Sequence, residues 1–446
     1  MVLLINPRTS KPTELHTSYF REPNNGLLYL AAVLDNNNID VEILDLEQYI
    51  ALSANEKKKL LIKVCVDHQI VGLTSLTNTF YDAVELASII KQAFPNKIII
   101  FGGPHVSFLH ESILKTDFSG KNVIDFICIG EAEYSFLKIV KFLKKAHTKA
   151  SYLEDIRDKV KTIEAIAFIN SKGNYEYTGI QKQLIDLRSL PLPARFKLIP
   201  INHQYTVANV IINRGCPNEC SFCSRQNLFQ SIRIRTIDSL EAELRDINSS
   251  YTYEFVNFYD NININKTFFE KFCKVLKKRE FNLPWGCELR VDNLSNNHIL
   301  LLKQAGCKVV ATGIESASKS VLQQNFKFQN PNKVKKGIEY LKTNDIPVQV
   351  YFVLGLPGET VQTFQETLDY IKKLPLTEDD TIDYFMATPY PGSKLWEQQE
   401  EFGINIFEYD FSKYDCQHII FESKILTKEH LEPMRQKAKE IETFFK

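Results

Sequence analysis

Short apolar runs alternate with longer amphipathic segments over roughly the first 145 residues of the chain. The short runs are typical of buried strands, and the longer segments have the periodicity of helices. Regular alternation of the two predicts an α/β fold with a parallel, doubly wound, Rossmann-like sheet. The predicted strands are Val2–Ile5, Val41–Leu44, Ile70–Thr74, Lys97–Phe101 and Phe126–Ile129, and the predicted helices are Gly26–Leu34, Asn55–Val66, Tyr81–Ala93, Val106–Leu114 and Glu133–Leu143.

The loops that follow these strands are the candidate binding segments, because ligands of doubly wound sheets bind beyond the carboxyl ends of the strands. Glycines there let the backbone approach a ligand closely, although a plain turn uses them equally well. Hydroxyl groups can bond a ligand, although helix capping is their commoner use. A lone histidine in such a turn is more often structural. The candidates are Asn6, Pro7, Thr74, Ser75, Thr77, Gly102, Gly103, Pro104, His105, Gly130 and Glu131.

The same alternation resumes after Val207 and predicts six further β/α units. Six units form a partial (β/α)6 barrel of the TIM type, in which chemistry sits at the carboxyl ends of the strands. The predicted strands are Ala208–Asn213, Glu254–Phe258, Pro284–Glu288, Val309–Thr312, Val348–Leu354 and Ile382–Ala387.

A different pattern separates the two alternating regions. Ile163–Ile169 and Tyr175–Tyr177 flank a Ser-Lys-Gly-Asn turn and predict a hairpin, and the prolines between Asp186 and Pro200 favour an extended linker. We therefore expect a doubly wound domain at 1–150, a hairpin and linker at 151–205, a partial barrel at 206–400 and a helical extension at 401–446.

Composition narrows the classes of partner. Lys+Arg and Asp+Glu both number 54, so the net charge of zero gives no support for a nucleic-acid partner. The apolar runs are too short to span a bilayer, and the segment Met1–Pro7 lacks the basic leader of a signal peptide. We expect a cytoplasmic protein without a membrane span, whose nine cysteines are reduced.

Three of the cysteines lie close together after the first predicted barrel strand. The segment Arg214-Gly-Cys216-Pro-Asn-Glu-Cys220-Ser-Phe-Cys223 has the spacing C-x3-C-x2-C, which lets one loop wrap a single metal centre. A cubane iron–sulfur cluster usually takes four thiolates. Three thiolates leave one iron open, as a catalytic metal site requires. The motif therefore predicts a [4Fe–4S] cluster on these three cysteines.

Zinc is the main alternative for clustered cysteines, but zinc sites usually combine a C-x2-C or Cys/His element with a distant second pair. Gly215 and Pro217 favour a loop rather than a packed core for this segment. The remaining cysteines are isolated, and we expect them to be small core residues. They are Cys65, Cys128, Cys273, Cys287, Cys307 and Cys416.

The cysteine motif resembles that of the radical S-adenosylmethionine (SAM) superfamily, in which the aromatic residue before the last cysteine lies near the adenine. Phe222 has that position here. Gly313-Ile-Glu315-Ser316, after the fourth barrel strand, resembles the segment that contacts the ribose and methionine of SAM. Arg290 and Asp260 match recurring positions after the third and second strands. The resemblance implies that Phe222, Arg290, Gly313, Glu315 and Ser316 bind SAM.

Two of these residues also have structural interpretations. Glu315 is suited to bond the ribose or the amino group of SAM, but a carboxylate at a helix start is the alternative. Arg290 is suited to pair with the carboxylate of SAM, but it can equally form a salt bridge with Asp292 or Glu288.

The N-terminal half resembles the cobalamin-binding domain of the B12-dependent subfamily at Asn6-Pro7, Gly26–Leu30, Gly102–His105 and Gly130–Glu133. This resemblance implies a bound cobalamin near the loop residues named above. The Asp-x-His-x-x-Gly pattern that supplies a histidine to cobalt in other B12 domains is absent, because neither His105 nor any other histidine has that spacing. We therefore expect no histidine ligand to the cobalt.

The resemblance also implies an activity. One electron, delivered by a donor such as a flavodoxin or ferredoxin, would cleave SAM to methionine and a 5′-deoxyadenosyl radical between the facing strand ends. The expected reaction is a cobalamin-dependent methyl transfer to an unactivated carbon. A cobalamin-containing cyclase or rearrangement enzyme and a non-catalytic cobalamin or redox sensor are the alternatives. A methylthiotransferase is set aside, because those enzymes carry three further N-terminal cysteines. The sequence does not indicate the substrate.

Overall fold

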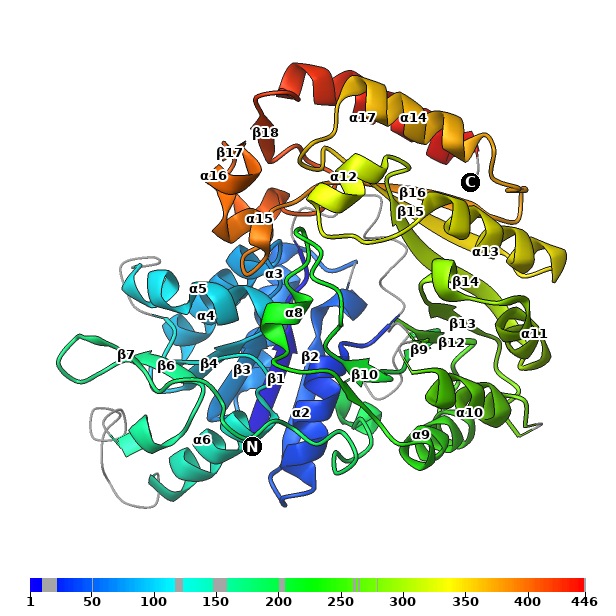
Figure 1. Ribbon diagram of the computed structural model, residues 1–446. Coiled ribbons are helices and arrows are strands. Elements are labelled where there is room, and N and C mark those ends of the chain that lie inside the picture. Colours follow the sequence, from blue (N-terminus) through cyan, green and yellow to red (C-terminus); the bar gives the residue numbers. More distant parts are fainter. Residues whose placement is uncertain are drawn as a thin grey trace. The chain divides into compact units, whose positions relative to one another are not determined.

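The computed structural model describes residues 1–9, 22–49, 51–116, 123–146, 159–199, 205–259, 262–263, 265–278 and 280–444. The chain forms two compact units, one of residues 1–205 with 228–230 and one of residues 206–227 with 231–446. Each unit is an α/β fold built on its own large sheet (Figure 1).

An eight-stranded sheet with the order β7-β6-β5-β4-β3-β1-β2-β8 forms the centre of the N-terminal unit. β1 to β5 and β8 are parallel, whereas the hairpin of β6 and β7 extends the sheet antiparallel from β5. The five predicted strands are confirmed. The strands are β1 (Val2–Asn6), β2 (Val41–Asp45), β3 (Ile70–Thr74), β4 (Ile98–Gly102), β5 (Phe126–Cys128), β6 (Ile166–Ile169), β7 (Tyr175–Tyr177) and β8 (Leu198–Ile199).

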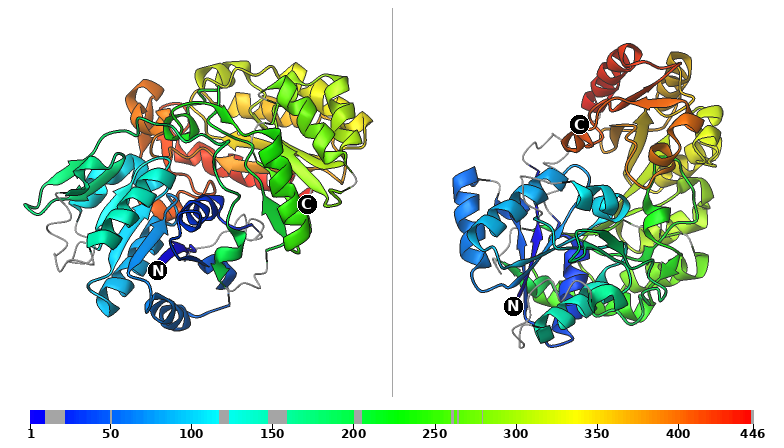
Figure 2. Two further views of the ribbon diagram at one scale, coloured as in Figure 1. Left: turned by 90° about the horizontal axis from the view of Figure 1, so that it is seen from below. Right: turned by 90° about the vertical axis from the view of Figure 1, so that its left-hand side faces the viewer.

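Helices cover both faces of this sheet, which explains why its central strands β1, β3 and β4 are largely apolar (Figure 2). α2 packs against α6, and α3 packs against α4. The first four residues of β1 are completely buried. The helices are α2 (Asn25–Asp35), α3 (Ala54–Cys65), α4 (Phe80–Ala93), α5 (Pro104–Lys115) and α6 (Glu133–Ala146), with 3-10 turns η1 (Leu46–Tyr49), η2 (Val160–Thr162) and η3 (Arg195–Lys197).

The strand order reverses between β1 and β3. The connection from β1 through α2 leads to β2 on one side, whereas β3, β4 and β5 follow one another on the other side. Such a reversal leaves a crevice outside the carboxyl ends of the two neighbouring strands. Asn6 ends β1 and Thr74 ends β3, so the predicted loops at these residues flank the crevice.

Six parallel strands in the order β16-β15-β14-β13-β12-β9 form the main sheet of the C-terminal unit and confirm the partial barrel. The strands are β9 (Val207–Asn209), β12 (Phe255–Phe258), β13 (Trp285–Glu288), β14 (Cys307–Glu315), β15 (Val348–Leu354) and β16 (Thr381–Met386). The helices are α8 (Arg225–Leu228), α9 (Ile237–Ser250), α10 (Lys266–Leu276), α11 (Asn296–Gln304), α12 (Lys319–Gln324), α13 (Pro331–Thr343), α14 (Val361–Ile371), α15 (Lys394–Glu397), α16 (Gln399–Phe402) and α17 (Lys428–Phe444), with 3-10 turns η4 (Val291–Asn293) and η5 (Phe411–Lys413).

Three parts of the chain differ from the sequence-based expectation. The predicted strand at 208–213 is split, because β9 ends at Asn209 and β10 (Asn213–Arg214) pairs instead with β11 (Arg233–Ile234). The proline-containing stretch ends in β8, which joins the N-terminal sheet. The segment after residue 400 contains the hairpin of β17 (Ile404–Ile406) and β18 (Phe421–Ser423) as well as helix. Strands of two or three residues are too short to show a period in the sequence.

Among the described residues, none of the helices combines the length and the apolar character that a membrane span requires.

Candidate active site

The three clustered cysteines lie on one loop, residues 215–223, which we call the cysteine loop. The loop starts directly after β10. Gly215 has a φ of +83°, and a Cβ atom there would lie 2.5 Å from the carbonyl oxygen of Ser231. The start of the loop therefore requires glycine, because its backbone is left-handed and because it lies against the main chain of Ser231.

The three thiols are close enough to influence one another. Burial raises the pKa of the Cys220 thiol to about 11; the charge of Lys327 opposes this shift, and Glu315 and the other two thiols add to it. Cys216 and Cys220 are partly buried, whereas Cys223 is exposed. Binding to iron would deprotonate these thiols, since a coordinating thiol loses its proton to the metal.

The arrangement of the thiols is compatible with a cluster. Within the described residues, no three His, Cys, Asp or Glu side chains converge as the ligands of one ion would. In a cubane each thiolate binds a separate iron, so the thiolates need not share one metal.

The six cysteines outside the loop are buried, except Cys416. Cys416 is partly buried, and its sulfur lies 3.1 Å from the hydroxyl of Tyr390.

Ser221 fixes the middle of the cysteine loop. Its hydroxyl donates to Asn325 Oδ1 at 2.7 Å, and its main-chain N–H donates to the Asn325 carbonyl at 3.0 Å. The Asn325 amide in turn donates to the carbonyls of Val321 and Pro357, both at 2.8 Å. Ser221 and Asn325 are completely buried. A satisfied buried network of this kind gives the loop a single conformation.

Arg290 fixes the loop from a second side. Its guanidinium donates to both carboxylate oxygens of Asp292, at 3.1 and 2.9 Å. Nη1 donates to Asn218 Oδ1 at 2.8 Å, and Nη2 donates to the carbonyl of Phe328 at 2.7 Å. The salt bridge with Asp292 is therefore present, and the binding of SAM by Arg290 stays a prediction.

Glu315 ends β14 on a β-bulge. The register with β15 shifts between Gly313 and Glu315, and Glu315 has a φ of +63°. The bulge turns the carboxylate back over Gly313, where a Cβ atom would lie 2.3 Å from Glu315 Oε1. The alternative of a helix-start carboxylate is wrong, because the next helix begins only at Lys319. Bulges commonly re-aim side chains in this way beside active sites.

Lys327 is the partner of the Glu315 carboxylate. Its Nζ donates to Glu315 Oε1 at 2.7 Å, and both side chains are almost buried. Burial disfavours the charge of Lys327, but Glu315 and Cys220 outweigh it, so the pKa of Lys327 is raised. A permanent positive charge thus lies beside the cysteine loop.

The other residues predicted to contact SAM have different surroundings. The ring of Phe222 packs against a buried cluster that includes Leu395 and Tyr414. Ser316 is completely buried, and its hydroxyl lies 3.3 Å from Thr367 Oγ1 and accepts from the Ser318 N–H. Ser316 therefore supports the end of β14 internally. Asp260 lies outside the described residues.

The concave face of the barrel sheet carries side chains that the motifs did not indicate. Along β15, Gln349, Tyr351 and Val353 alternate with fully buried residues. Gln349 donates to Asp383 Oδ2 at 2.6 Å, and the rings of Tyr351 and Phe385 are 5.6 Å apart. The alternation of side chains along these strands could have predicted that every second residue faces away from the buried core.

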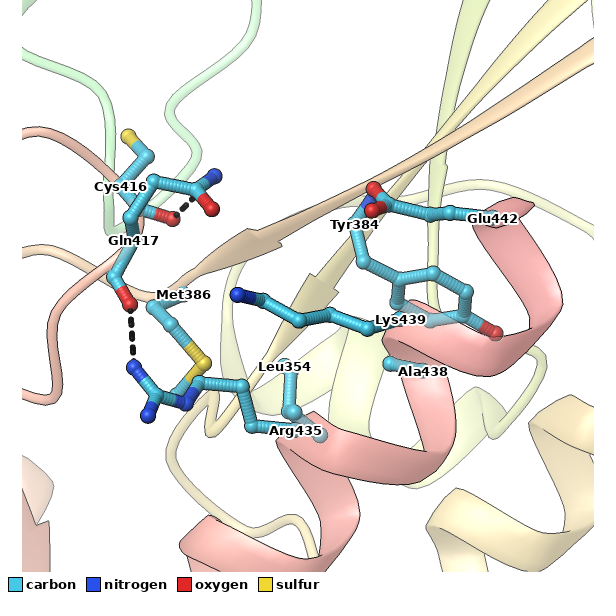
Figure 3. Close-up of a pocket in the computed structure, with 9 residues that line it drawn as sticks. All are labelled: Leu354, Tyr384, Met386, Cys416, Gln417, Arg435, Ala438, Lys439 and Glu442. Carbon is cyan, nitrogen blue, oxygen red and sulfur yellow. Dashed lines mark hydrogen bonds between the residues drawn. The ribbon is translucent and has the colours of Figure 1, made fainter. Parts of the chain in front are cut away.

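A small pocket lies where α17 covers the edge strand β16 (Figure 3). Arg435 donates to the Gln417 carbonyl at 3.0 Å, and the Tyr384 N–H donates to Glu442 Oε1 at 2.5 Å. α17 thereby satisfies the open edge of the sheet. The lining residues are Leu354, Tyr384, Met386, Cys416, Gln417, Arg435, Ala438, Lys439 and Glu442, and the residues predicted from the motifs are not among them.

The candidate residues of the N-terminal unit lie at or just after the carboxyl ends of β1, β3, β4 and β5. The Asn6 amide donates to Asp45 Oδ1 at 2.9 Å, and Pro7 is buried. Gly103 has a φ of +101°, and a Cβ atom there would lie 2.6 Å from the Ser75 carbonyl oxygen. A Cβ atom at Gly102 would be in ordinary van der Waals contact with the Cys128 carbonyl oxygen, 3.9 Å away.

Ser75 has the one property here that points directly to a ligand. Its side chain is completely buried, and its Oγ has no hydrogen-bond partner among the described residues. A buried hydroxyl without a partner is costly, so a ligand that bonds it would stabilise the crevice. Of the two neighbouring threonines in the sequence, Thr74 is partly buried and Thr77 is buried.

His105 and Pro104 lie in the first turn of α5 rather than in a loop. The His105 ring is 4.5 Å from that of Phe80, and burial lowers the pKa of His105 to about 3. This histidine is therefore a neutral core residue, as its isolation in the sequence favours. The Gly130 N–H donates to Ser107 Oγ at 2.9 Å, and Glu131 is partly buried.

Comparison with known families connects the two units. A model of the radical SAM superfamily matches residues 210–371, which include the cysteine loop and β12 to β15. A model of the B12 binding domain matches residues 15–140. The chain belongs to the B12-binding radical SAM enzymes. The radical SAM domain thus carries the cysteine loop, and the B12 binding domain carries the crevice beside Ser75.

Several known proteins match this chain over most of their own length. An uncharacterized methyltransferase of Pyrococcus horikoshii is 27% identical over 424 residues, covering 93% of this chain and 86% of the relative. An anaerobic magnesium-protoporphyrin IX monomethyl ester cyclase of Rubrivivax gelatinosus is 27% identical over 358 residues, covering 78% of this chain but 60% of the cyclase. The solved structure of the radical SAM methyltransferase TsrM from Kitasatospora setae, at 14% identity, has a TM-score of 0.75 and covers 98% of this chain and 90% of TsrM.

Proposed function

We propose that this protein is a cobalamin-dependent radical SAM methyltransferase that acts on an unactivated carbon. The observation that carries the proposal is the cysteine loop, which is held by buried hydrogen bonds between Ser221 and Asn325 in a chain that also has a B12 binding domain. A [4Fe–4S] cluster on Cys216, Cys220 and Cys223 would keep one iron open for SAM.

When they are bound, the cluster supplies an electron to SAM and cobalamin carries a methyl group. The protein positions the reactants. Ser221 and Asn325 hold the loop, and Gly313 leaves room for the Glu315 carboxylate at the carboxyl end of β14. Glu315 is suited to accept from the ribose or the amino group of SAM, in exchange for its bond to Lys327. A flavodoxin or ferredoxin is the proposed source of electrons.

The B12 binding domain has a polar group suited to a ligand such as cobalamin. The buried Ser75 hydroxyl directly follows β3, which pairs in parallel with β4 and its last residue Gly102. His105 is buried against Phe80, so it does not serve as a ligand to cobalt in this proposal.

Methyl transfer is favoured over cyclisation by the share of each relative's length that this chain matches. This chain covers 86% of the Pyrococcus methyltransferase but 60% of the Rubrivivax cyclase, so a large part of the cyclase has no counterpart here.

The test uses the full chain, reconstituted anaerobically with iron, sulfide and cobalamin. We expect about four irons per chain, 5′-deoxyadenosine after addition of SAM and dithionite, and transfer of an isotope-labelled SAM methyl group to the bound corrinoid. Unchanged iron content after replacement of all three cysteines by alanine would refute the cluster. Release of 5′-deoxyadenosine without any methyl transfer would favour a cyclase or rearrangement enzyme. Absence of both reactions would favour a sensor.

A further inference from the structure

A chain of polar contacts leads from η4, which follows β13, to the first cysteine of the loop. Asp292 binds the Arg290 guanidinium, Arg290 donates to Asn218, and Asn218 Nδ2 donates to Cys216 Sγ at 3.4 Å. We propose that Asn218, oriented by Arg290 and Asp292, is a positioning residue that keeps a hydrogen bond on the Cys216 sulfur and thereby raises the reduction potential of the cluster. This inference rests on the proposed cluster.

The direction of the Asn218 amide follows from its neighbour. A guanidinium only donates hydrogen bonds, so the amide oxygen must face Arg290 Nη1, which lies 2.8 Å away. The NH2 group of the same amide is then directed at the sulfur of Cys216. Arg290 itself is fixed by Asp292 and by the Phe328 carbonyl, and the Arg290 and Asp292 side chains are only 15% and 6% exposed. The orientation of the amide is therefore imposed from outside the loop.

A donor on this sulfur has a chemical consequence. Reduction adds an electron to the cluster and makes its thiolate ligands more basic, so a hydrogen bond to the sulfur stabilises the reduced state more than the oxidised state. Loss of the bond must lower the potential. Because SAM cleavage requires the reduced cluster, the same loss would slow the release of 5′-deoxyadenosine at a fixed strength of reductant.

The contacts also decide between two roles of Arg290. A guanidinium has five N–H donors. Four of them are used, two by Asp292, one by Asn218 and one by Phe328. The edge of the guanidinium formed by Nε and Nη2 already faces Asp292, so a bidentate pair with the SAM carboxylate would have to displace a protein partner. Arg290 is better placed to act through Asn218 than to bind SAM.

The test is a potentiometric titration of the reconstituted full-length protein, followed by the electron paramagnetic resonance signal of the reduced cluster. Asn218→Leu should retain iron and disfavour reduction by at least about tenfold, which is about 59 mV for one electron. Arg290→Lys keeps the charge but cannot bond all three partners, so it should shift the potential in the same direction. The double variant should show no further shift, because both residues act through one bond.

Glu219→Gln is the matched control. Glu219 lies in the same loop, is 56% exposed, and pairs with Lys394 at 2.9 Å. Loss of its negative charge cannot lower the potential, so a downward shift in this control would show that any change in the loop has the same effect and would overturn the inference.

The outcomes separate the inference from the proposed function. Wild-type protein that takes up no iron would refute the proposed cluster. Wild-type protein with a cluster, together with an unchanged potential in Asn218→Leu, would refute the role of Asn218 alone. If Asn218→Leu loses iron, Arg290→Lys decides, because it leaves the sequence of the cysteine loop unchanged and removes the bond that orients the Asn218 amide. An unchanged potential with weaker SAM binding in Arg290→Lys would make Arg290 a SAM ligand instead.

Discussion

Single residues at the end of β14 set the position of the carboxylate that we expect to bind SAM. Gly313 is required by the Glu315 side chain, which occupies the space where a Cβ atom would be. Glycine is suited to this position because it has no side chain, and not because of its backbone freedom. The sequence indicated this segment by resemblance, but Lys327 could not be found in that way, since it meets Glu315 only through the fold.

Gly313→Ala should therefore displace the Glu315 carboxylate and weaken SAM binding at least about tenfold, which corresponds to about 1.4 kcal/mol. Iron content should stay at the wild-type level, because the cysteine loop is held by other contacts. Equilibrium dialysis with labelled SAM and an iron assay measure the two effects. Glu315→Ala serves as the comparison, because both variants act on one carboxylate. Normal SAM binding by either variant would mean that the carboxylate is structural.

At the scale of elements, loops after the barrel strands contain buried polar groups that tie them together. Asn325 follows α12 and bonds both the cysteine loop and the Pro357 carbonyl in the loop after β15. Replacement of Asn325 by leucine leaves at least two buried groups without partners, at roughly 1–3 kcal/mol each.

We expect Asn325→Leu to lower the free energy of unfolding of the apoprotein by about 3 kcal/mol, as measured with urea. Asn344→Leu is the control. Asn344 is only partly buried, and its amide donates to the carbonyl of Tyr340 at 2.8 Å, so its loss should cost about 1 kcal/mol or less. Equal losses in the two variants would show that Asn325 has no special role.

The loop after β15 also predicts a pH dependence. Burial raises the pKa of Glu359 from 4.5 to about 8, against the effect of a hydrogen bond from the Gly355 N–H at 2.6 Å. The folded state thus holds this proton more tightly than the unfolded state does. The stability that results is complete below about pH 4.5 and is lost as the pH rises through about 8.

Glu359→Gln removes this titration. Between pH 5 and 8, the free energy of unfolding of the wild type should fall relative to that of the variant, by at most about 1.4 kcal/mol per pH unit. Urea unfolding of both proteins at the two pH values measures the difference. Parallel pH profiles would contradict a raised pKa at Glu359.

The sequence predicted elements and their order better than contacts between loops. The long β/α alternation has a clear period. It therefore allowed β1 to β5 of the first sheet and the parallel barrel to be predicted. The cysteines were found by spacing, and Asp292 was recognised as one possible partner of Arg290. Asn218 lies inside the motif but has no distinguishing spacing, and Asn325 is more than a hundred residues from its partner Ser221. Such pairs exist only once the chain has folded.

At the scale of the molecule, two compact units carry two cofactor sites that should load independently. We expect the full-length protein to bind cobalamin with its dimethylbenzimidazole tail removed from cobalt. We expect no nitrogen ligand from the protein in its place, because the chain lacks the Asp-x-His-x-x-Gly pattern and His105 is buried against Phe80. Electron paramagnetic resonance of the cob(II)alamin-loaded protein should show no nitrogen superhyperfine splitting, and neither should His105→Ala. Splitting that disappears in His105→Ala would identify this histidine as a ligand.

Replacement of Cys216, Cys220 and Cys223 by alanine should leave cobalamin binding unchanged while iron is lost, because the cysteine loop and the B12 binding domain belong to different units. Ultraviolet–visible titration with cobalamin compares the variant with the wild type. A parallel loss of both cofactors would show that the units load together.

The pairing of β8 and of the β6–β7 hairpin has a practical meaning for dissecting the protein. A fragment cut at residue 150 would lack all three strands and would expose β5 and β2 as unprotected edges of a long apolar sheet. Bare edges of this kind pair with other chains, so such a fragment should aggregate. Extending it to Tyr205, whose hydroxyl donates to the buried Asp45, would keep both edges covered. The boundary at which the N-terminal half becomes a self-contained, soluble piece therefore lies at Tyr205, well beyond the end of the B12 match at residue 140.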